Sequence, residues 1–130
     1  PQTMAWVKYD PSNLDDIVKL DREFKDIIAL LERKHIMFHL GDETVMERHA
    51  TVNKNIISIG TQHYDTVVVM PGQFFMEKTQ AMLDAFKKNG GRIVCANELQ
   101  DNPVIDNPAI KYTERVIDGK HLYYFVNLSL

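Results

Sequence analysis

The residues best placed to do chemistry in this sequence are two adjacent carboxylates, Asp42 and Glu43, which follow Gly41 at the end of a short apolar run. Ligands of open α/β sheets bind outside the carboxyl ends of strands, where these side chains would lie. With Gln73, from the segment Pro71–Phe75, they form a candidate ligand rim for sugar hydroxyls. The alternative is structural, because Asp is a common helix N-cap and Glu suits a first helical turn.

The same carboxylates are poorly spaced for catalysis. Glycosidases hold two facing carboxylates roughly 5–10 Å apart, whereas adjacent helical residues point about 100° apart. The five histidines lack metal-ligand spacing. The single cysteine, Cys95, lies in an apolar run without the Gly-x-Cys-x-Gly turn of a nucleophile elbow, and is expected to pack as a small hydrophobe. We therefore expect no catalytic residue, no metal site and no cofactor.

Aromatic residues offer a second kind of candidate. Trp6, Tyr9 and Tyr64 could stack on a sugar ring or pack against another domain. Aromatic side chains contribute large areas to cores and interfaces. We therefore predict that these three residues are interface aromatics.

The hydropathy pattern predicts the elements that position these residues. Apolar residues recurring every three or four positions predict helices, at about Leu14 to Lys34, Glu43 to His49 and Phe75 to Lys88. Short apolar runs predict strands, at His35–Leu40, Thr66–Met70 and Arg92–Ala96. A small hairpin is predicted over Thr51–Ile59, turning at residues 53–55, and the polar residues 97–108 are predicted to form a loop.

The order strand, helix, strand from Thr66 to Ala96 is a βαβ unit, in which parallel pairing is the default. The predicted fold class is therefore α/β, a three-layer sandwich around a short parallel sheet. The α/β domain is predicted to span residues 1–110. Residues 111–130 change character, since Asp118-Gly119 between two apolar arms is a strong hairpin signal over Tyr112–Ile117 and His121–Leu128. An isolated hairpin with two apolar faces is marginal in water, so we interpret it as the start of a following β-rich domain.

Composition excludes several classes of partner. The chain of 130 residues is 45% hydrophobic and 25% charged, as in a globular protein. A net charge of −3 with scattered Lys and Arg argues against nucleic acid binding, and no apolar stretch is long enough to cross a bilayer. One cysteine slightly favours a cytoplasmic location, and the sequence leaves the compartment open.

Four stretches resemble a segment that follows the catalytic barrel in large bacterial glycoside hydrolases, including α-L-rhamnosidase-like enzymes and, more distantly, β-galactosidases. They are Leu30–Glu43, Gly60–Pro71, Gly90–Val94 and Val116–Asn127. The resemblance implies a flavodoxin-like domain, similar to class I glutamine amidotransferases, between a (β/α)8 barrel and C-terminal β-sandwiches.

The resemblance also implies that the catalytic carboxylates lie on the barrel, outside this chain. The expected partners are then the barrel and β-sandwich of the same polypeptide, a homo-oligomeric copy, and carbohydrate through the parent enzyme. The expected function is a non-catalytic structural or interface domain of a glycoside hydrolase. Two alternatives stay open: a sugar or small-molecule binding module at the rim, and a stand-alone amidotransferase-like enzyme, which the missing Cys elbow disfavours.

Overall fold

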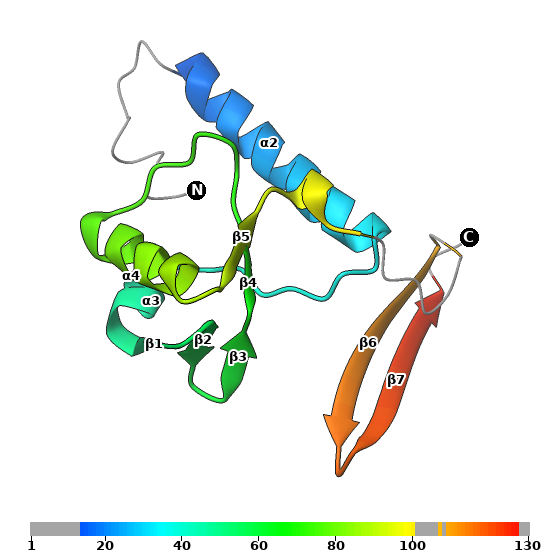
Figure 1. Cartoon of the computed structure of the whole chain (residues 1–130). Coiled ribbons are helices and arrows are strands. Elements are labelled where there is room, and N and C mark those ends of the chain that lie inside the picture. Colours follow the sequence, from blue (N-terminus) through cyan, green and yellow to red (C-terminus); the bar gives the residue numbers. More distant parts are fainter. Residues whose placement is uncertain (1–13, 101–106, 108, 128–130) are drawn as a thin grey trace.

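The computed structural model describes residues 14–100, 107 and 109–127, and it shows an α/β chain that ends in an antiparallel hairpin (Figure 1). The elements in chain order are α2 (Leu14–Arg33), α3 (Glu43–His49), β1 (Ala50–Asn53), β2 (Ile56–Ile59), β3 (Gln62–Tyr64), β4 (Thr66–Val68), α4 (Glu77–Lys88), β5 (Arg92–Val94), the 3₁₀ helix η2 (Ala96–Glu98), β6 (Ile110–Ile117) and β7 (Lys120–Asn127).

The predicted helices are confirmed. Leu31, on the apolar stripe of α2, is 3% exposed, while Phe24 and Ile27 on the same stripe are half-buried. The helix ends with His35 in the left-handed region at φ 53. There the N–H of Ile36 donates to the carbonyl of Leu31 at 3.0 Å, and the N–H of His35 donates to Glu32 at 3.1 Å. This is the Schellman pattern, here built on a histidine in place of the usual glycine.

The predicted strand at His35–Leu40 is wrong. Residues 36–42 form neither helix nor strand. Ile36 and Phe38 are half-buried while Met37 and His39 are exposed, so the segment has the alternating burial that suggests a strand. A strand also requires a hydrogen-bonded neighbour, and within the described residues β4 pairs only with β5.

The predicted βαβ unit is confirmed. β4 and β5 are parallel, with Thr66 opposite Arg92 and Val68 opposite Val94. Figure 1 shows this pair between α2 on one side and α4 on the other. The strands are shorter than predicted, because Met70 and Ala96 lie outside the ladder. Ala96 instead begins the 3₁₀ helix η2. The sequence predicts Ala96 as the last residue of a strand and residues 97–108 as a loop.

The small predicted hairpin is also confirmed, since β1 pairs antiparallel with β2 and the chain turns at Lys54 with φ 53. β3 extends this sheet by pairing with β2, and the sequence analysis did not predict it. Polar Gln62 and His63 lack the apolar alternation that marks a strand.

The core joins these sheets to α4. Phe86, Leu83 and Ile57 form a buried cluster at 0%, 2% and 2% exposure. Half-buried Val67 and Ile93 pack against it from β4 and β5. The aromatic ring of Phe86 therefore ties the helix to both sheets.

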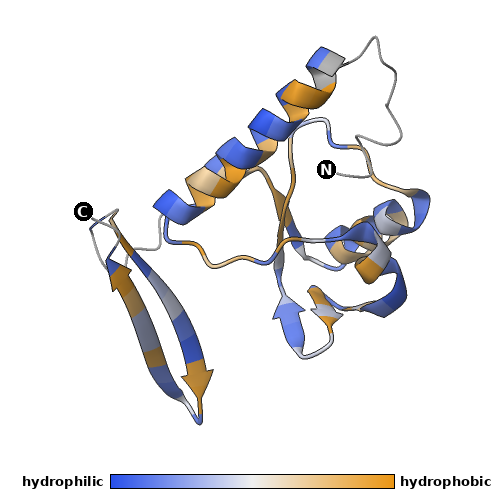
Figure 2. Cartoon of the chain, turned by 180° about the vertical axis from the view of Figure 1, so that it is seen from behind, coloured by the Kyte–Doolittle hydropathy of each residue, from blue (hydrophilic) through white to orange (hydrophobic). Residues whose placement is uncertain are grey.

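The predicted C-terminal hairpin is confirmed up to Asn127, and its predicted last residue, Leu128, lies outside the described residues. Asp118 and Gly119 both have positive φ, 49 and 71, as a type I′ turn requires. The hairpin extends away from the rest of the chain, and its apolar positions are visible in Figure 2. It contacts the body near the end of α2, where the rings of His35 and Tyr112 stack at 5.5 Å.

Candidate functional site

Asp42 lies at the predicted rim, where it caps α3. Its backbone is extended, with φ −108 and ψ 126, and its Oδ1 accepts a hydrogen bond from the N–H of Val45 at 2.9 Å. The carbonyl of Asp42 also accepts from the N–H of Met46 at 2.8 Å. This arrangement is that of an N-cap, the structural alternative set out for this residue.

Glu43 joins two helices. Its Oε2 accepts from the N–H of Met76, the N-cap residue of α4, at 2.8 Å. Met76 has no capping side chain of its own, so the carboxylate of Glu43 provides the acceptor and the negative charge that favour a helix N-terminus. One helical turn further on, Glu47 forms an ion pair with Lys78. These contacts hold α3 against α4.

Gln73 closes the turn after β4. Its Oε1 accepts from the N–H of Met70 at 3.0 Å, and its own N–H donates to the carbonyl of Met70 at 3.1 Å. Between them Gly72 has φ +68, a conformation that suits glycine. The structure thus places Asp42 and Glu43 at the first turns of α3 and α4, whereas Gln73 lies in the turn that follows β4. Each of these side chains accepts a backbone hydrogen bond.

Of the three predicted interface aromatics, Trp6 and Tyr9 lie outside the described residues. Tyr64 is half-buried at the end of β3. Its hydroxyl forms a hydrogen bond with Nδ1 of His39 at 2.8 Å, and the two rings meet edge to face at 5.8 Å. Its polar end is therefore engaged within the chain.

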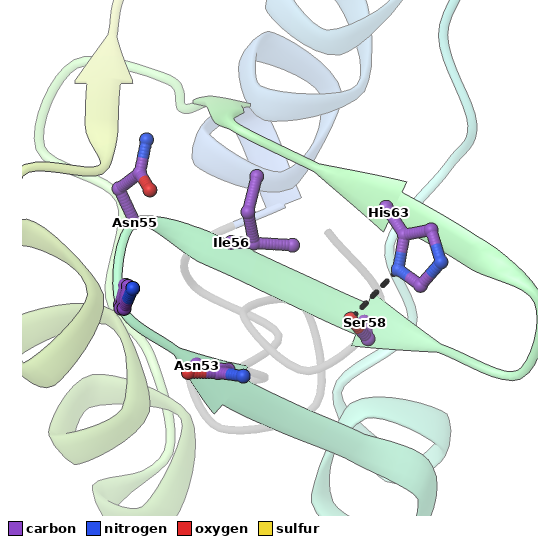
Figure 3. Close-up of a pocket in the computed structure, with 6 residues that line it drawn as sticks. Asn53, Asn55, Ile56, Ser58 and His63 are labelled. Carbon is purple, nitrogen blue, oxygen red and sulfur yellow. Dashed lines mark hydrogen bonds between the residues drawn. The ribbon is translucent and has the colours of Figure 1, made fainter.

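A shallow hollow of about 390 Å³ lies beside the β1–β2 turn, and the sequence analysis did not predict it. Ser58 and His63, opposite each other on β2 and β3, share a hydrogen bond of 2.8 Å between Oγ and Nδ1 (Figure 3). A Ser–His pair becomes a nucleophile and base only when a third group orients the imidazole. Among the described residues Ser58 is the single hydrogen-bond partner of the His63 ring. No third group therefore orients the imidazole of His63 among these residues.

A second polar cluster lies on the hairpin. Oε1 of Glu114 accepts from the Tyr123 hydroxyl at 2.9 Å and also contacts Nδ1 of His121. The hydrogen bond from His121, followed by that from Tyr123, lowers the pKa of Glu114. The bond to Glu114 raises the pKa of Tyr123. The register about Asp118-Gly119, which sets Glu114 opposite Tyr123, could have revealed this cluster from the sequence.

Possible metal ligands do not cluster in the part of the chain that the structure describes. No group of three or more His, Cys, Asp or Glu side chains could hold a metal ion there. Cys95 is half-buried, and its backbone N–H donates to Oε1 of Glu98 at 2.6 Å. Within the same residues, no helix combines the length and apolar character needed to span a membrane.

No protein-family model, no curated protein and no solved structure matches this chain. The resemblance to glycoside hydrolases therefore stays a prediction from the sequence.

Proposed function

We propose that this chain is a non-catalytic structural and interface domain of a multidomain glycoside hydrolase that acts in carbohydrate breakdown. The β6–β7 hairpin is the observation that carries this proposal. Apolar side chains are exposed on both of its faces, with Val116 at 60% on one face and Tyr124 at 71% on the other. Exposed apolar surface of this kind is typical of an interaction site.

The rim supports the same role. The carboxylates of Asp42 and Glu43 accept backbone hydrogen bonds at the starts of α3 and α4. A carboxylate engaged in this way stabilises a helix N-terminus, which gives both residues a structural role. The sequence resemblance supplies the enzymatic context, in which the barrel carries the reacting carboxylates.

The finer fold belongs to this proposal as well. We propose that the β4–β5 pair is the centre of a three-layer, flavodoxin-like sandwich. Its support is the parallel register, the α4 crossover and the helices on either side of the pair. A solution structure in which β4 and β5 pair antiparallel, or in which the two helices lie on one face, would contradict it.

Hydrogen exchange tests the interface role. The amide exchange of β6 and β7 is measured in the 130-residue chain and in a polypeptide that joins it to a barrel and a β-sandwich. We expect the ladder amides of Thr113 and Arg115 to exchange more slowly in the longer polypeptide, because the hairpin faces are then covered. Equal exchange in both would contradict an interface role.

Activity and binding assays test the non-catalytic role. We expect no turnover of aryl glycosides by the 130-residue chain. Turnover that Asp42→Asn or Glu43→Gln abolishes would overturn the proposal. Saturable heat on titration with a panel of monosaccharides, lost in Asp42→Ala, would instead favour a binding module at the rim.

A further inference from the structure

The outer edge of β7 carries backbone groups that β6 does not use. The N–H of Glu114 donates to Sδ of Met37 at 3.2 Å, so it points away from β7. Glu114 lies opposite Tyr123, and opposite residues of an antiparallel pair either both bond across the pair or both face outward. The N–H and C=O of Tyr123 therefore point away from β6. By alternation along the strand, so do those of His121 and Phe125.

Among the residues that the structure describes, none of the usual protections of an edge strand is present along β7. Between His121 and Asn127 the strand contains no proline, glycine or charged residue. Every residue of β7 is exposed, including Leu122 at 51% and Phe125 at 45%. A long apolar edge strand is a template for another strand, and proteins normally cover or charge it.

The outer edge of β6, unlike that of β7, is partly covered by other residues and carries charges. Met37 contacts it at Glu114, and Lys111 forms an ion pair of 3.7 Å with Glu32 of α2. Three charged residues, Lys111, Glu114 and Arg115, lie along this strand. The body and these charges protect β6, and β7 is left as the open edge.

We propose that the outer edge of β7 pairs antiparallel with β7 of a second copy of this chain, centred on Tyr123. The product is a continuous sheet in the order β6, β7, β7, β6, related by a two-fold axis. This inference goes beyond the scaffold role, which concerns the faces of the hairpin and not its edge.

The side chains fit this register. Tyr123 lies opposite the partner's Tyr123, and the outward backbone groups of the two exchange hydrogen bonds. Leu122 lies opposite the partner's Tyr124, and His121 opposite the partner's Phe125. The single cation, Lys120, lies opposite the partner's Val126, so no like charges face each other. Aromatic and apolar cross-strand pairs of this kind stabilise a sheet.

Self-pairing of β6 would instead bring like charges opposite each other in its central registers. A pair centred on Thr113 places Lys111 opposite the partner's Arg115. A pair centred on Glu114 places two carboxylates opposite each other. Like charges directly opposite are destabilising, so charge disfavours these two central registers of β6, whereas the β7 register centred on Tyr123 has no such pair.

Sedimentation over a wide range of protein concentration tests the proposal, with Phe125→Pro as the first variant. Proline removes an outward N–H and leaves the β6–β7 ladder intact, as at natural edge strands. We expect the wild-type chain to dimerise and the variant to associate about tenfold more weakly or worse, because the bond is lost twice in a symmetric dimer. Cross-strand proton contacts between Thr113 and Tyr124 check that the hairpin persists.

Two double variants keep the test valid if the proline variant loses its hairpin. Leu122→Lys with Tyr124→Lys places like charges opposite each other across the dimer, whereas Leu122→Lys with Tyr124→Glu places opposite charges there. We expect the second to associate about tenfold more tightly than the first. A wild-type chain that is monomeric at every concentration, or equal association of the two double variants, would overturn the proposal.

Discussion

Two phenylalanines show how differently the two regions of this molecule use the same residue type. Phe86, in the α/β body (residues 14–100), is 0% exposed against Ile57 and Leu83. Phe125, in the hairpin, is 45% exposed, although it lies in a largely apolar strand. The body buries one apolar cluster by crossing α4 over two sheets, although Leu40 and Phe74 of the body stay exposed. The hairpin has a complete ladder, but no layer formed by the described residues covers it, so its apolar side chains are exposed there.

The largest expected effect is a loss of folding stability that distinguishes the body from the hairpin. Phe86→Ala should destabilise the body by about 3–5 kcal/mol, because it removes a fully buried ring and leaves a cavity. Urea unfolding followed by circular dichroism measures the loss. Phe125→Ala is the matched control, and it should cost well under half as much. Equal losses would mean that the exposure of the hairpin does not hold in solution.

The next effect concerns the packing of glycine against the same ring. A Cβ at Gly91 would lie far inside van der Waals distance of the Phe86 ring. Gly91→Ala should therefore cost about 1–3 kcal/mol through overpacking. Gly41→Ala is the control, because its Cβ would meet only Sδ of Met46 at an ordinary 3.5 Å. Thermal unfolding of both variants measures the difference, and a Gly91→Ala chain as stable as Gly41→Ala would contradict the close packing.

A smaller effect tests the carboxylate that joins the helices. Glu43→Ala removes the acceptor of the Met76 N–H and should cost about 1 kcal/mol, as the loss of a helix cap does. Glu43→Gln keeps an oxygen acceptor and should cost less. Urea unfolding compares them. If Glu43→Ala proves neutral, the carboxylate is free for another role, and the ligand-rim hypothesis gains support.

The smallest effect concerns pH and the hairpin alone. The lowered pKa of Glu114 means that its contribution to hairpin stability is present above the pKa of the unfolded chain and is lost as pH falls through the folded value. The raised pKa of Tyr123 has the opposite sign, so its contribution is lost as pH rises through a value above 10.0.

Nuclear magnetic resonance of the hairpin amides across pH measures both losses of hairpin stability, the one at low pH and the one at high pH. Glu114→Gln should remove the loss of hairpin stability at low pH, while the amides of the body should respond equally in the variant and the wild-type chain. An unchanged loss of stability at low pH in the variant would show that the contacts of Glu114 with His121 and Tyr123 do not persist in solution.

The sequence was informative wherever a local signal fixes the structure. Asp42 marks the start of α3 because its side chain caps the helix, and Asp118-Gly119 marks the C-terminal hairpin because both residues adopt positive φ. The strand prediction at residues 35–40 failed because a strand depends on a partner elsewhere in the chain. Alternation at Ile36 and Phe38 reports burial and not pairing.

The candidate site was predictable to the same extent. The sequence predicts Asp42, Glu43 and Gln73 at one ligand rim. In the structure Asp42 and Glu43 lie at the first turns of α3 and α4, and Gln73 lies in the turn after β4. The sequence did not reveal that Glu43 would meet the N–H of Met76, because that contact spans more than thirty positions. The Ser58–His63 pair was missed for a similar reason, since β3 has no apolar pattern of its own.

The β4–β5 register has a consequence for the order of folding. Thr66 and Arg92 pair across the whole of α4, whereas β6 and β7 close through a tight turn, and a hairpin of this kind forms in about 1–10 μs. Contacts between distant residues form more slowly. During refolding, we therefore expect β6 and β7 to pair transiently, with their apolar faces exposed, before β4 and β5 pair. Dilution should raise the yield of native chains, because encounters between such half-folded molecules then become rarer.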